Sequence, residues 1–169
     1  MFKKFLIVVL YAISLYGQDY NLEKDWVGMS EKEKKAIAAS FQMGAKYNLG
    51  YTLAAINWHE SKGGRWRISA DGNDVGYYHV NVYWYLKENG IRNSIWKRLE
   101  YKTLLITNQK LELDYVISML VKLRKKYKNA WLKIWRDYNG SPVYAKDILN
   151  KVIFLRKHTT ISSGGISLR

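Results

Sequence analysis

The segment from Tyr51 to Ser61 constrains the fold most, because it is apolar around most of its circumference when it is drawn as a helix. Its apolar positions fall on two adjoining stripes of the helix surface: Tyr51, Leu53, Ala54, Ala55, Ile56 and Trp58. A helix with so little polar surface is buried, so the sequence predicts an interior helix that other elements surround. Gly63-Gly64 follows directly and predicts the end of this helix.

Glu60 is the exception within this segment, since it shares a stripe with Leu53 and Ile56 and falls in the last helical turn. Burial and the negative end of the helix dipole both disfavour an ionised carboxylate. We therefore expect a carboxyl group that keeps its proton near neutral pH, as a general acid must. The residues alone leave one alternative, a glutamate at the rim of a core helix that pairs with a Lys or Arg side chain.

The other carboxylates do not repeat this pattern. Several lie in charged or polar stretches that predict solvated faces: Glu31, Glu33, Glu88, Glu100, Glu112 and Asp114. Asp71 and Asp74 lie in the Gly/Asn-rich segment 70–74, whose composition predicts turns. Glu60 is therefore the candidate catalytic residue.

The remaining pattern predicts one mainly helical domain at 20–158, because 169 residues suit a single domain with a substantial core. Capping signals at Ser30 and at Ser141-Pro142 and the apolar periodicity predict the helices. They are expected at 31–46, 51–61, 82–88, 91–101, 111–127, 130–138 and 142–155. The Gly/Asn-rich segment 61–81 predicts an irregular loop with a small β element, and 159–169 a flexible tail.

The N-terminal segment 1–17 has two lysines, a short apolar stretch and then small residues, which predicts a secretory signal peptide and export to the periplasm. An uncleaved anchor helix is the alternative. The net charge is +14, and loss of Lys3 and Lys4 with the signal peptide leaves +12. Such a charge favours polyanions, which outside the cytoplasm are wall polymers, lipid headgroups or free nucleic acid, and it does not choose among them.

The sequence contains no recognisable motif for binding a metal or a cofactor. The chain has no cysteine, which excludes a disulfide framework and a Cys-based metal site or nucleophile. His59-Glu60 begins like a zinc motif, but Gly63 stands where the second histidine belongs. The sequence also lacks a phosphate-cradling glycine loop and a G-x-S-x-G elbow. We expect neither a metal nor a cofactor.

Three separated segments, taken together, resemble the successive motifs of lytic transglycosylases. They are Glu60-Ser61 with Ser69 nine residues after the glutamate, 73–81, and Tyr138-Asn139-Gly140. The family pattern is Glu-Ser, a serine nine residues on, Gly-Leu-Met-Gln-(Ile/Val)-Asn, and later Ala-Tyr-Asn-x-Gly. The resemblance covers about 48–157 and is closest to the small specialised enzymes that accompany type III and type IV secretion machines.

The chain departs from the family pattern at four positions. Tyr77 and Tyr78 replace Leu-Met, His79 replaces the glutamine, and Asp137 replaces the alanine before Tyr-Asn. The departure at His79 matters most, because the family's glutamine lines the sugar groove. A histidine there can still serve as a neutral hydrogen-bonding substitute, or it can change specificity or abolish activity.

The resemblance implies an all-α, lysozyme-like domain and a lyase reaction on peptidoglycan. In the family, a single glutamate protonates the oxygen between N-acetylmuramic acid and N-acetylglucosamine. The same glutamate then removes the proton from the muramoyl 6-hydroxyl, which closes a 1,6-anhydro ring. One carboxylate suffices for this reaction, whereas ordinary glycosidases need two.

The resemblance also implies roles for individual residues. Glu60 would be the acid and base, Ser69 would contact the region of the muramoyl N-acetyl group, Tyr138 would orient Glu60 by a hydrogen bond, and Asn139 would shape the groove. The glycan would be contacted from the second motif by Gly76, Tyr77, His79 and Asn81. The expected partners of this monomer are glycan strands and components of a secretion apparatus, with no specific nucleic acid.

Three alternatives remain open at this point. A wall-binding protein could keep the fold and lose the chemistry through His79. A lysozyme-like hydrolase could use Asp71 or Asp74 as a second carboxylate. A secreted nucleic-acid binder could rely on the basic charge alone.

Overall fold

The computed structural model describes residues 21–162 and 165–168. The expected signal peptide at 1–17 lies outside the described residues. Contacts divide the chain into two compact units, residues 1–31 and 32–169. In the first unit, the described part contains a short helix at 21–27.

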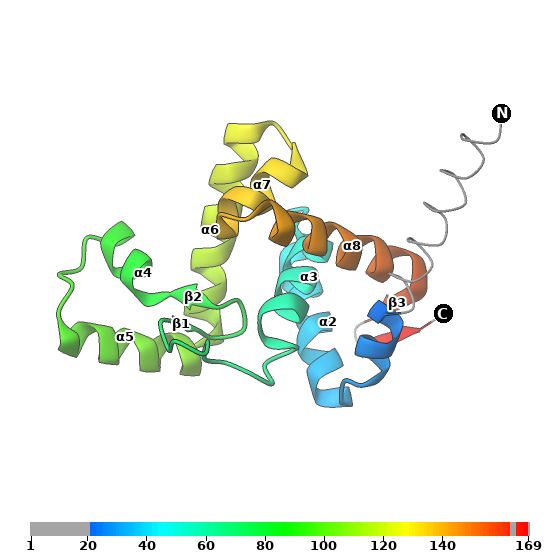
Figure 1. The fold of residues 1–169 in the computed structure, drawn as a ribbon, viewed down its shortest axis with the longest axis horizontal. Helices are drawn as coiled ribbons and strands as arrows, with labels where there is room; N and C mark the ends of the chain where they lie inside the picture. The colour runs from blue at the N-terminus through cyan, green and yellow to red at the C-terminus, as the bar shows by residue number, and fades with distance from the viewer. Residues whose placement is uncertain (1–20, 163–164, 169) are drawn as a thin grey trace. The chain divides into compact units, whose positions relative to one another are not determined.

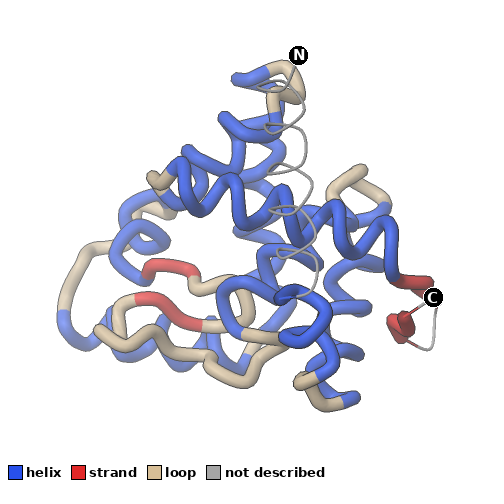
Figure 2. Tube along the Cα trace, turned by 45° about the vertical axis from the view of Figure 1, so that its right-hand side comes forward, coloured by secondary structure: helices blue, strands red, loops and turns tan. Residues whose placement is uncertain are grey.

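The second unit is mainly helical, as the sequence predicts (Figures 1 and 2). Its helices are α2 (Glu31–Ala45), α3 (Gly50–Ser61), α4 (Val82–Glu88), α5 (Ile95–Thr107), α6 (Gln109–Tyr127), α7 (Trp131–Asn139) and α8 (Pro142–His158). Its strands are β1 (Asp74–Val75), β2 (Val80–Asn81), β3 (Thr159–Ser162) and β4 (Gly165–Leu168).

The helix α3 lies in the core, which confirms the expectation for its apolar sequence. Its side chains Leu53, Ala54, Ala55, Ile56 and Trp58 have no exposed surface. It packs along α8, and α8 in turn packs along α7, which contacts α6 (Figure 1). The helix ends at Ser61 because Lys62 adopts a left-handed conformation and Gly63 follows with a φ of 69°. A Cβ on Gly63 would lie 2.4 Å from the Glu33 carbonyl oxygen, so only glycine fits there.

A buried polar network ties α2, α3 and the following loop together. Asn57 donates from Nδ2 to the Ser40 hydroxyl at 2.7 Å, and the Tyr78 hydroxyl donates to the same oxygen at 2.9 Å. Ser61 donates from Oγ to the Tyr77 carbonyl at 2.9 Å and accepts from the Gly64 N–H at 2.9 Å. Because these buried polar groups find partners, the network fixes where the loop lies against α3.

The segment between α3 and α4 contains the small β element that the sequence predicts. Strands β1 and β2 pair antiparallel, with Asp74 opposite Asn81 and Val75 opposite Val80. Figure 2 shows the two strands side by side in a segment that otherwise consists of loops and turns. The pairing brings the two ends of the second motif together.

Two elements differ from the expectation. The helix α5 starts at Ile95 and not at 91, because Ser94 caps it by accepting a hydrogen bond from the Lys97 N–H at 3.2 Å. In place of the flexible tail, β3 and β4 form an antiparallel hairpin in which Thr159 lies opposite Leu168. β-Branched residues fill the start of β3, and they favour strands. None of the helices in the described part of the chain has the length and apolar character that crossing a bilayer requires.

Candidate active site

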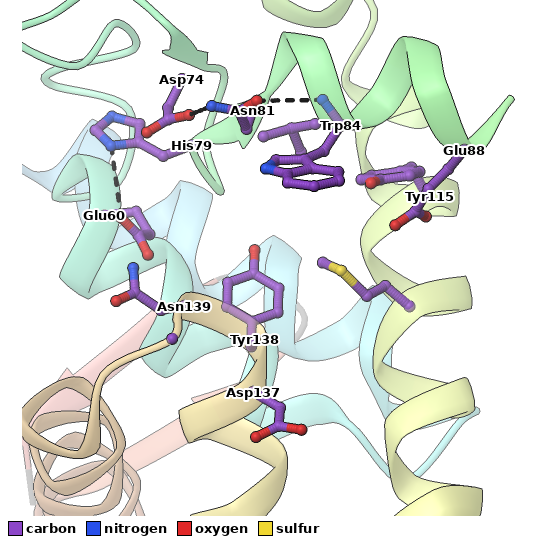
Figure 3. Close-up of a pocket in the computed structure, with 13 residues that line it drawn as sticks. Glu60, Asp74, His79, Asn81, Trp84, Glu88, Tyr115, Asp137, Tyr138 and Asn139 are labelled. Carbon is purple, nitrogen blue, oxygen red and sulfur yellow. Dashed lines mark hydrogen bonds and ion pairs between the residues drawn. The ribbon is translucent and has the colours of Figure 1, made fainter. Parts of the chain in front are cut away.

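A cleft of about 490 Å³ brings the three motif segments together (Figure 3). Glu60 enters it from α3, the β1–β2 segment forms one wall, and the C-terminal end of α7 forms another. Helices α4 and α6 contribute the remaining side. The lining residues are Glu60, Asp74, His79, Val80, Asn81, Trp84, Glu88, Tyr115, Met119, Asp137, Tyr138, Asn139 and Gly140.

The glutamate that the sequence singles out faces this cleft from the penultimate position of α3. Its side chain is 12% exposed, so the carboxyl group is largely shielded and still reaches the cavity. The buried helix behind it holds the backbone of Glu60 in a fixed place. A proton donor needs this combination of a rigid support and access to a ligand.

His79 contacts Glu60 directly. Its Nδ1 lies 3.5 Å from Glu60 Oε2 (Figure 3). Its Nε2 lies 2.9 Å from the Trp66 carbonyl oxygen. A carbonyl oxygen only accepts, so Nε2 carries a proton and Nδ1 is the nitrogen that faces the carboxyl group. Burial lowers the pKa of His79, but the contacts with Glu60 and the Trp66 carbonyl, together with the charges of Glu60 and Asp74, raise it above its ordinary value overall. His79 and Glu60 are therefore paired at the cleft, a contact that the sequence did not reveal.

Glu112 holds the loop that carries His79. It lies on α6, has no exposed surface, and accepts hydrogen bonds from the backbone N–H groups of Tyr77 at 3.0 Å and Tyr78 at 2.7 Å. Burial raises the pKa of Glu112 to about 7, against the opposing effect of these two hydrogen bonds. The prediction of a solvated face for Glu112 is therefore wrong. The signal was present in the sequence, since Glu112 lies four residues before the buried Val116 and eight before the buried Leu120, on the same helical stripe.

Gly76 packs against Glu112 and does not line the cleft. Its φ is 88°, and a Cβ would come within 2.3 Å of the Glu112 carboxyl group. The glycine thus allows the close approach between the loop and α6, and it lies outside the cleft lining, although a contact with the glycan was expected for it.

Tyr138 lines the cleft but hydrogen-bonds elsewhere than expected. Its hydroxyl donates to the Tyr78 carbonyl at 3.1 Å, so it braces the loop. Burial raises the pKa of Tyr138 well above its ordinary value, and the charge of Glu60 adds to the shift. The two residues are therefore electrostatic neighbours, although the structure gives no hydrogen bond between them.

Tyr144 is a site residue that the sequence analysis missed. It lies in the first turn of α8, and its ring stacks on Tyr138 with centroids 6.0 Å apart. Its hydroxyl is buried and interacts with the Glu60 carboxyl group. Burial and then the charge of Glu60 raise the pKa of Tyr144 well above its ordinary value. Its place just after the Tyr-Asn-Gly segment, at a helix start, was the available signal.

Two other expected contacts lie outside the cleft lining. Ser69 is a turn residue whose hydroxyl donates to Asp71 Oδ1 at 2.6 Å and accepts from the Asp74 N–H at 3.0 Å. Tyr77 turns its ring under the Arg67 guanidinium, whose Cζ lies 4.2 Å from the ring centroid, and its hydroxyl accepts a hydrogen bond from Arg67. Both residues shape the loop that positions His79.

Asn81 and Asn139 do line the cleft, as expected. Asn81 donates from Nδ2 to Asp74 Oδ1 at 2.6 Å, and its Oδ1 caps α4 by accepting from the Trp84 N–H at 3.2 Å (Figure 3). Asn139 is exposed at the C-terminal end of α7. The two residues lie on opposite sides of the cleft (Figure 3).

Asp74 places a second carboxyl group in the same cleft as Glu60. Burial raises the pKa of Asp74 above its ordinary value, while the hydrogen bond from Asn81 opposes the shift. Asp71, the other candidate, stays outside the cleft lining, and its hydrogen bonds from Ser69 and Asn73 lower its pKa to about 2.

The cleft is acidic, whereas the chain as a whole is basic. Four of its lining residues are carboxylic acids, and none is Lys or Arg: the acids are Glu60, Asp74, Glu88 and Asp137. The rings of Trp84 and Tyr115 project into the cleft from α4 and α6 (Figure 3). Such a cleft suits a neutral ligand with faces that stack on aromatic rings, and it repels a polyanion. Within the described residues, no group of three His, Cys, Asp or Glu side chains is arranged to hold a metal ion.

Comparison with known proteins adds no neighbour: no family model, curated protein or solved structure matches the chain. The motifs and the geometry of the cleft are therefore the evidence for the function of the chain.

Proposed function

We propose that the protein is a peptidoglycan lytic transglycosylase with a lysozyme-like helical domain. The observation that carries the proposal is that Glu60, at the end of a buried helix, faces a cleft to which all three motif segments contribute. The aromatic and uncharged polar groups of the cleft suit a chain of neutral sugar rings. Export to the periplasm and an association with a secretion apparatus belong to the same proposal, and they rest on the N-terminal sequence and the motif resemblance.

In the proposed reaction, Glu60 first donates a proton to the oxygen between the muramoyl C1 and the N-acetylglucosamine C4. The C1–O bond breaks, and the N-acetylglucosamine end leaves as an alcohol. The Glu60 carboxylate then removes the proton from the muramoyl 6-hydroxyl, whose oxygen bonds to C1 and closes the anhydro ring. Glu60 ends the cycle protonated, so the reaction requires neither water as a reactant nor a second carboxylate as a catalyst.

His79 supplies a reason why Glu60 can hold this proton. The pair with one shared proton is either an imidazolium beside a carboxylate or a neutral imidazole beside a carboxylic acid. A bound glycan excludes water from the cleft, and a drier environment disfavours separated charges. Substrate binding therefore shifts the proton from His79 towards Glu60, and the acid is ready when the substrate is in place.

A lysozyme-like hydrolase is the second candidate, and the position of Asp74 favours it. A retaining or inverting glycosidase needs a second carboxylate on the cleft, to act as nucleophile or to activate water. Asp74 lines the same cavity as Glu60 and could take that part. It is, however, hydrogen-bonded to Asn81 at 2.6 Å, which suits a structural role within the β1–β2 pair.

The products of digestion distinguish the two candidates. Purified sacculi would be incubated with the mature protein, and the released fragments would be analysed by mass spectrometry. A transglycosylase yields 1,6-anhydro-muramoyl ends, which are lighter by one water than the reducing ends that a hydrolase yields. An Asp74→Asn variant should keep its activity in the first case and lose it in the second. Absence of any cleavage would leave a wall-binding protein as the better description.

A further inference from the structure

A second cavity of about 320 Å³ adjoins the cleft. It shares the walls formed by Asn81 and Trp84 with the cleft, and it extends between the loop at Gly72, the start of α4 and the helix α5. Two cations line it, Arg98 and Lys102, and no acidic residue does. We call it the anion cavity. Its charge is opposite to that of the cleft, where four acids and no Lys or Arg form the lining.

The two cations lack acidic partners in the described part of the chain. Lys102 is half-buried, and the structure gives its ammonium no hydrogen bond or ion pair. The ammonium lies over Gly72, since its Nζ is the one atom within 4 Å of a Cβ built there, at 3.6 Å. Asp71, the neighbouring acid, is hydrogen-bonded to Ser69 and Asn73. A half-buried ammonium without a counter-charge favours an anionic ligand.

Arg98 is held so that part of its guanidinium remains available. Its Nε donates to Asn93 Oδ1 at 2.6 Å, and its Cζ lies 5.9 Å from the centroid of the Tyr83 ring. These contacts orient the planar group, while its other N–H donors have no partner among the described residues. A guanidinium fixed in this way matches the two oxygens of a carboxylate. Leu99, 52% exposed, adds an apolar wall beside it.

We infer that the anion cavity binds the carboxylates of the peptide attached to the glycan strand that occupies the cleft. This inference rests on the proposed function. Each muramoyl residue of peptidoglycan carries an acidic peptide on its lactyl group, so a strand lying along Trp84 brings such a peptide to the shared wall. Because the two cavities have opposite charges, each binds a different part of the same ligand. The neutral sugar chain occupies the cleft, and the acidic, partly aliphatic peptide occupies the anion cavity beside it.

The test compares two forms of one substrate, soluble glycan strands with their peptides and the same strands after an amidase has removed them. Binding is measured by tryptophan fluorescence in the Glu60→Gln background, which prevents turnover. We expect the peptide-bearing strand to bind about tenfold more tightly, the effect of hydrogen bonds to a charged group. Arg98→Gln with Lys102→Met should abolish this preference. The control, Lys125→Gln with Lys133→Met, removes the same charge from exposed positions and should keep the preference.

Other outcomes overturn the inference in distinguishable ways. Equal affinity for the two strands, or a preference that survives Arg98→Gln with Lys102→Met, shows that the cavity does not bind the peptide, while cleavage of sacculi by the wild type would still support the proposed function. Loss of the preference in the control as well shows general charge attraction. Displacement of the strand by inorganic phosphate as readily as by free stem peptide, at one ionic strength, shows a phosphate site. If the preference for the peptide-bearing strand is retained but the wild type cleaves no peptidoglycan, the proposed enzymatic function is refuted, while peptide binding by the anion cavity is supported.

Discussion

The imidazole of His79 presents Nδ1 to Glu60 Oε2 at 3.5 Å while its Nε2 donates to the Trp66 carbonyl at 2.9 Å. The backbone carbonyl fixes which nitrogen carries the permanent proton, so Nδ1 is the nitrogen that faces the carboxyl group. The residue at which this chain departs from the family pattern is therefore in direct contact with the candidate acid.

Replacing Glu60 by glutamine should reduce peptidoglycan cleavage by about 10²-fold or more, because the amide fills the same volume and cannot transfer a proton. The fold should persist, as judged by circular dichroism and thermal unfolding. Glu88→Gln removes another carboxylate from the same cleft and serves as the control, with activity expected to stay near that of the wild type. Substantial activity in Glu60→Gln would refute the assignment.

The pH profile of cleavage should report on His79. Its pKa lies above the ordinary value, because the contacts with Glu60 and Trp66 and the charge of Asp74 outweigh the effect of burial. Below that pKa, the His79–Glu60 pair holds the shared proton. Above it the pair loses the proton, and kcat/KM should fall. His79→Gln removes the imidazole that holds the shared proton. The alkaline limb of the pH profile of this variant should therefore move to lower pH. An alkaline limb that stays in place in this variant would contradict the proton-sharing pair.

Stability should decrease as the pH rises through the pKa of Glu112. The folded protein binds this proton up to about pH 7, whereas the ordinary pKa is 4.5, so the contribution is complete below about 4.5 and is lost above 7. The difference corresponds to roughly 3 kcal/mol. His79 also has a raised pKa and acts in the same direction.

Urea unfolding at pH 5 and pH 8 measures this loss. Glu112→Gln should show a much smaller loss, with only the part from His79 remaining. Glu100→Gln, at an exposed position, should keep the loss of the wild type. An unchanged loss in Glu112→Gln would show that Glu112 does not titrate as the structure indicates.

Gly76→Ala should destabilise the protein by on the order of 3 kcal/mol, because the new Cβ meets the buried Glu112 carboxyl group and the φ of 88° strains any other residue. Gly90→Ala is the matched control. Its φ is 66° and its surroundings are open, so only the backbone strain of about 1 kcal/mol remains. Equal effects of the two substitutions, measured by urea unfolding, would rule out the packing role of Gly76.

The elements that could be predicted from sequence are those with a local physical cause. The burial of α3, its end at the glycines, and the capped start of α8 follow from side chains within a few residues of one another. The gathering of the motif segments in one cleft agrees with the family resemblance. The late start of α5 was accessible too, since Ser94 is an ordinary capping residue.

The details that escaped prediction depend on groups brought together by the fold. Glu112 seemed solvated because Lys110 and Asp114 lie two residues to either side of it, and its burial requires two backbone N–H groups from a loop about 35 residues away. Tyr138 was expected to bind Glu60, but a backbone carbonyl competes for its hydroxyl. Ser69 and Tyr77 form hydrogen bonds within their own loop, and the spacing of a motif does not reveal in which direction such side chains point.

The backbone of Tyr77 and Tyr78 is bonded by side chains from three different helices: Ser61 of α3, Glu112 of α6 and Tyr138 of α7. Such a segment cannot open by a local fluctuation, because its release requires three helices to give up contacts at once. The amide hydrogens of Tyr77 and Tyr78 should therefore exchange with solvent as slowly as those of the core helix α3. The candidate site then has no unfolding transition of its own, and it persists or disappears together with the hydrophobic core.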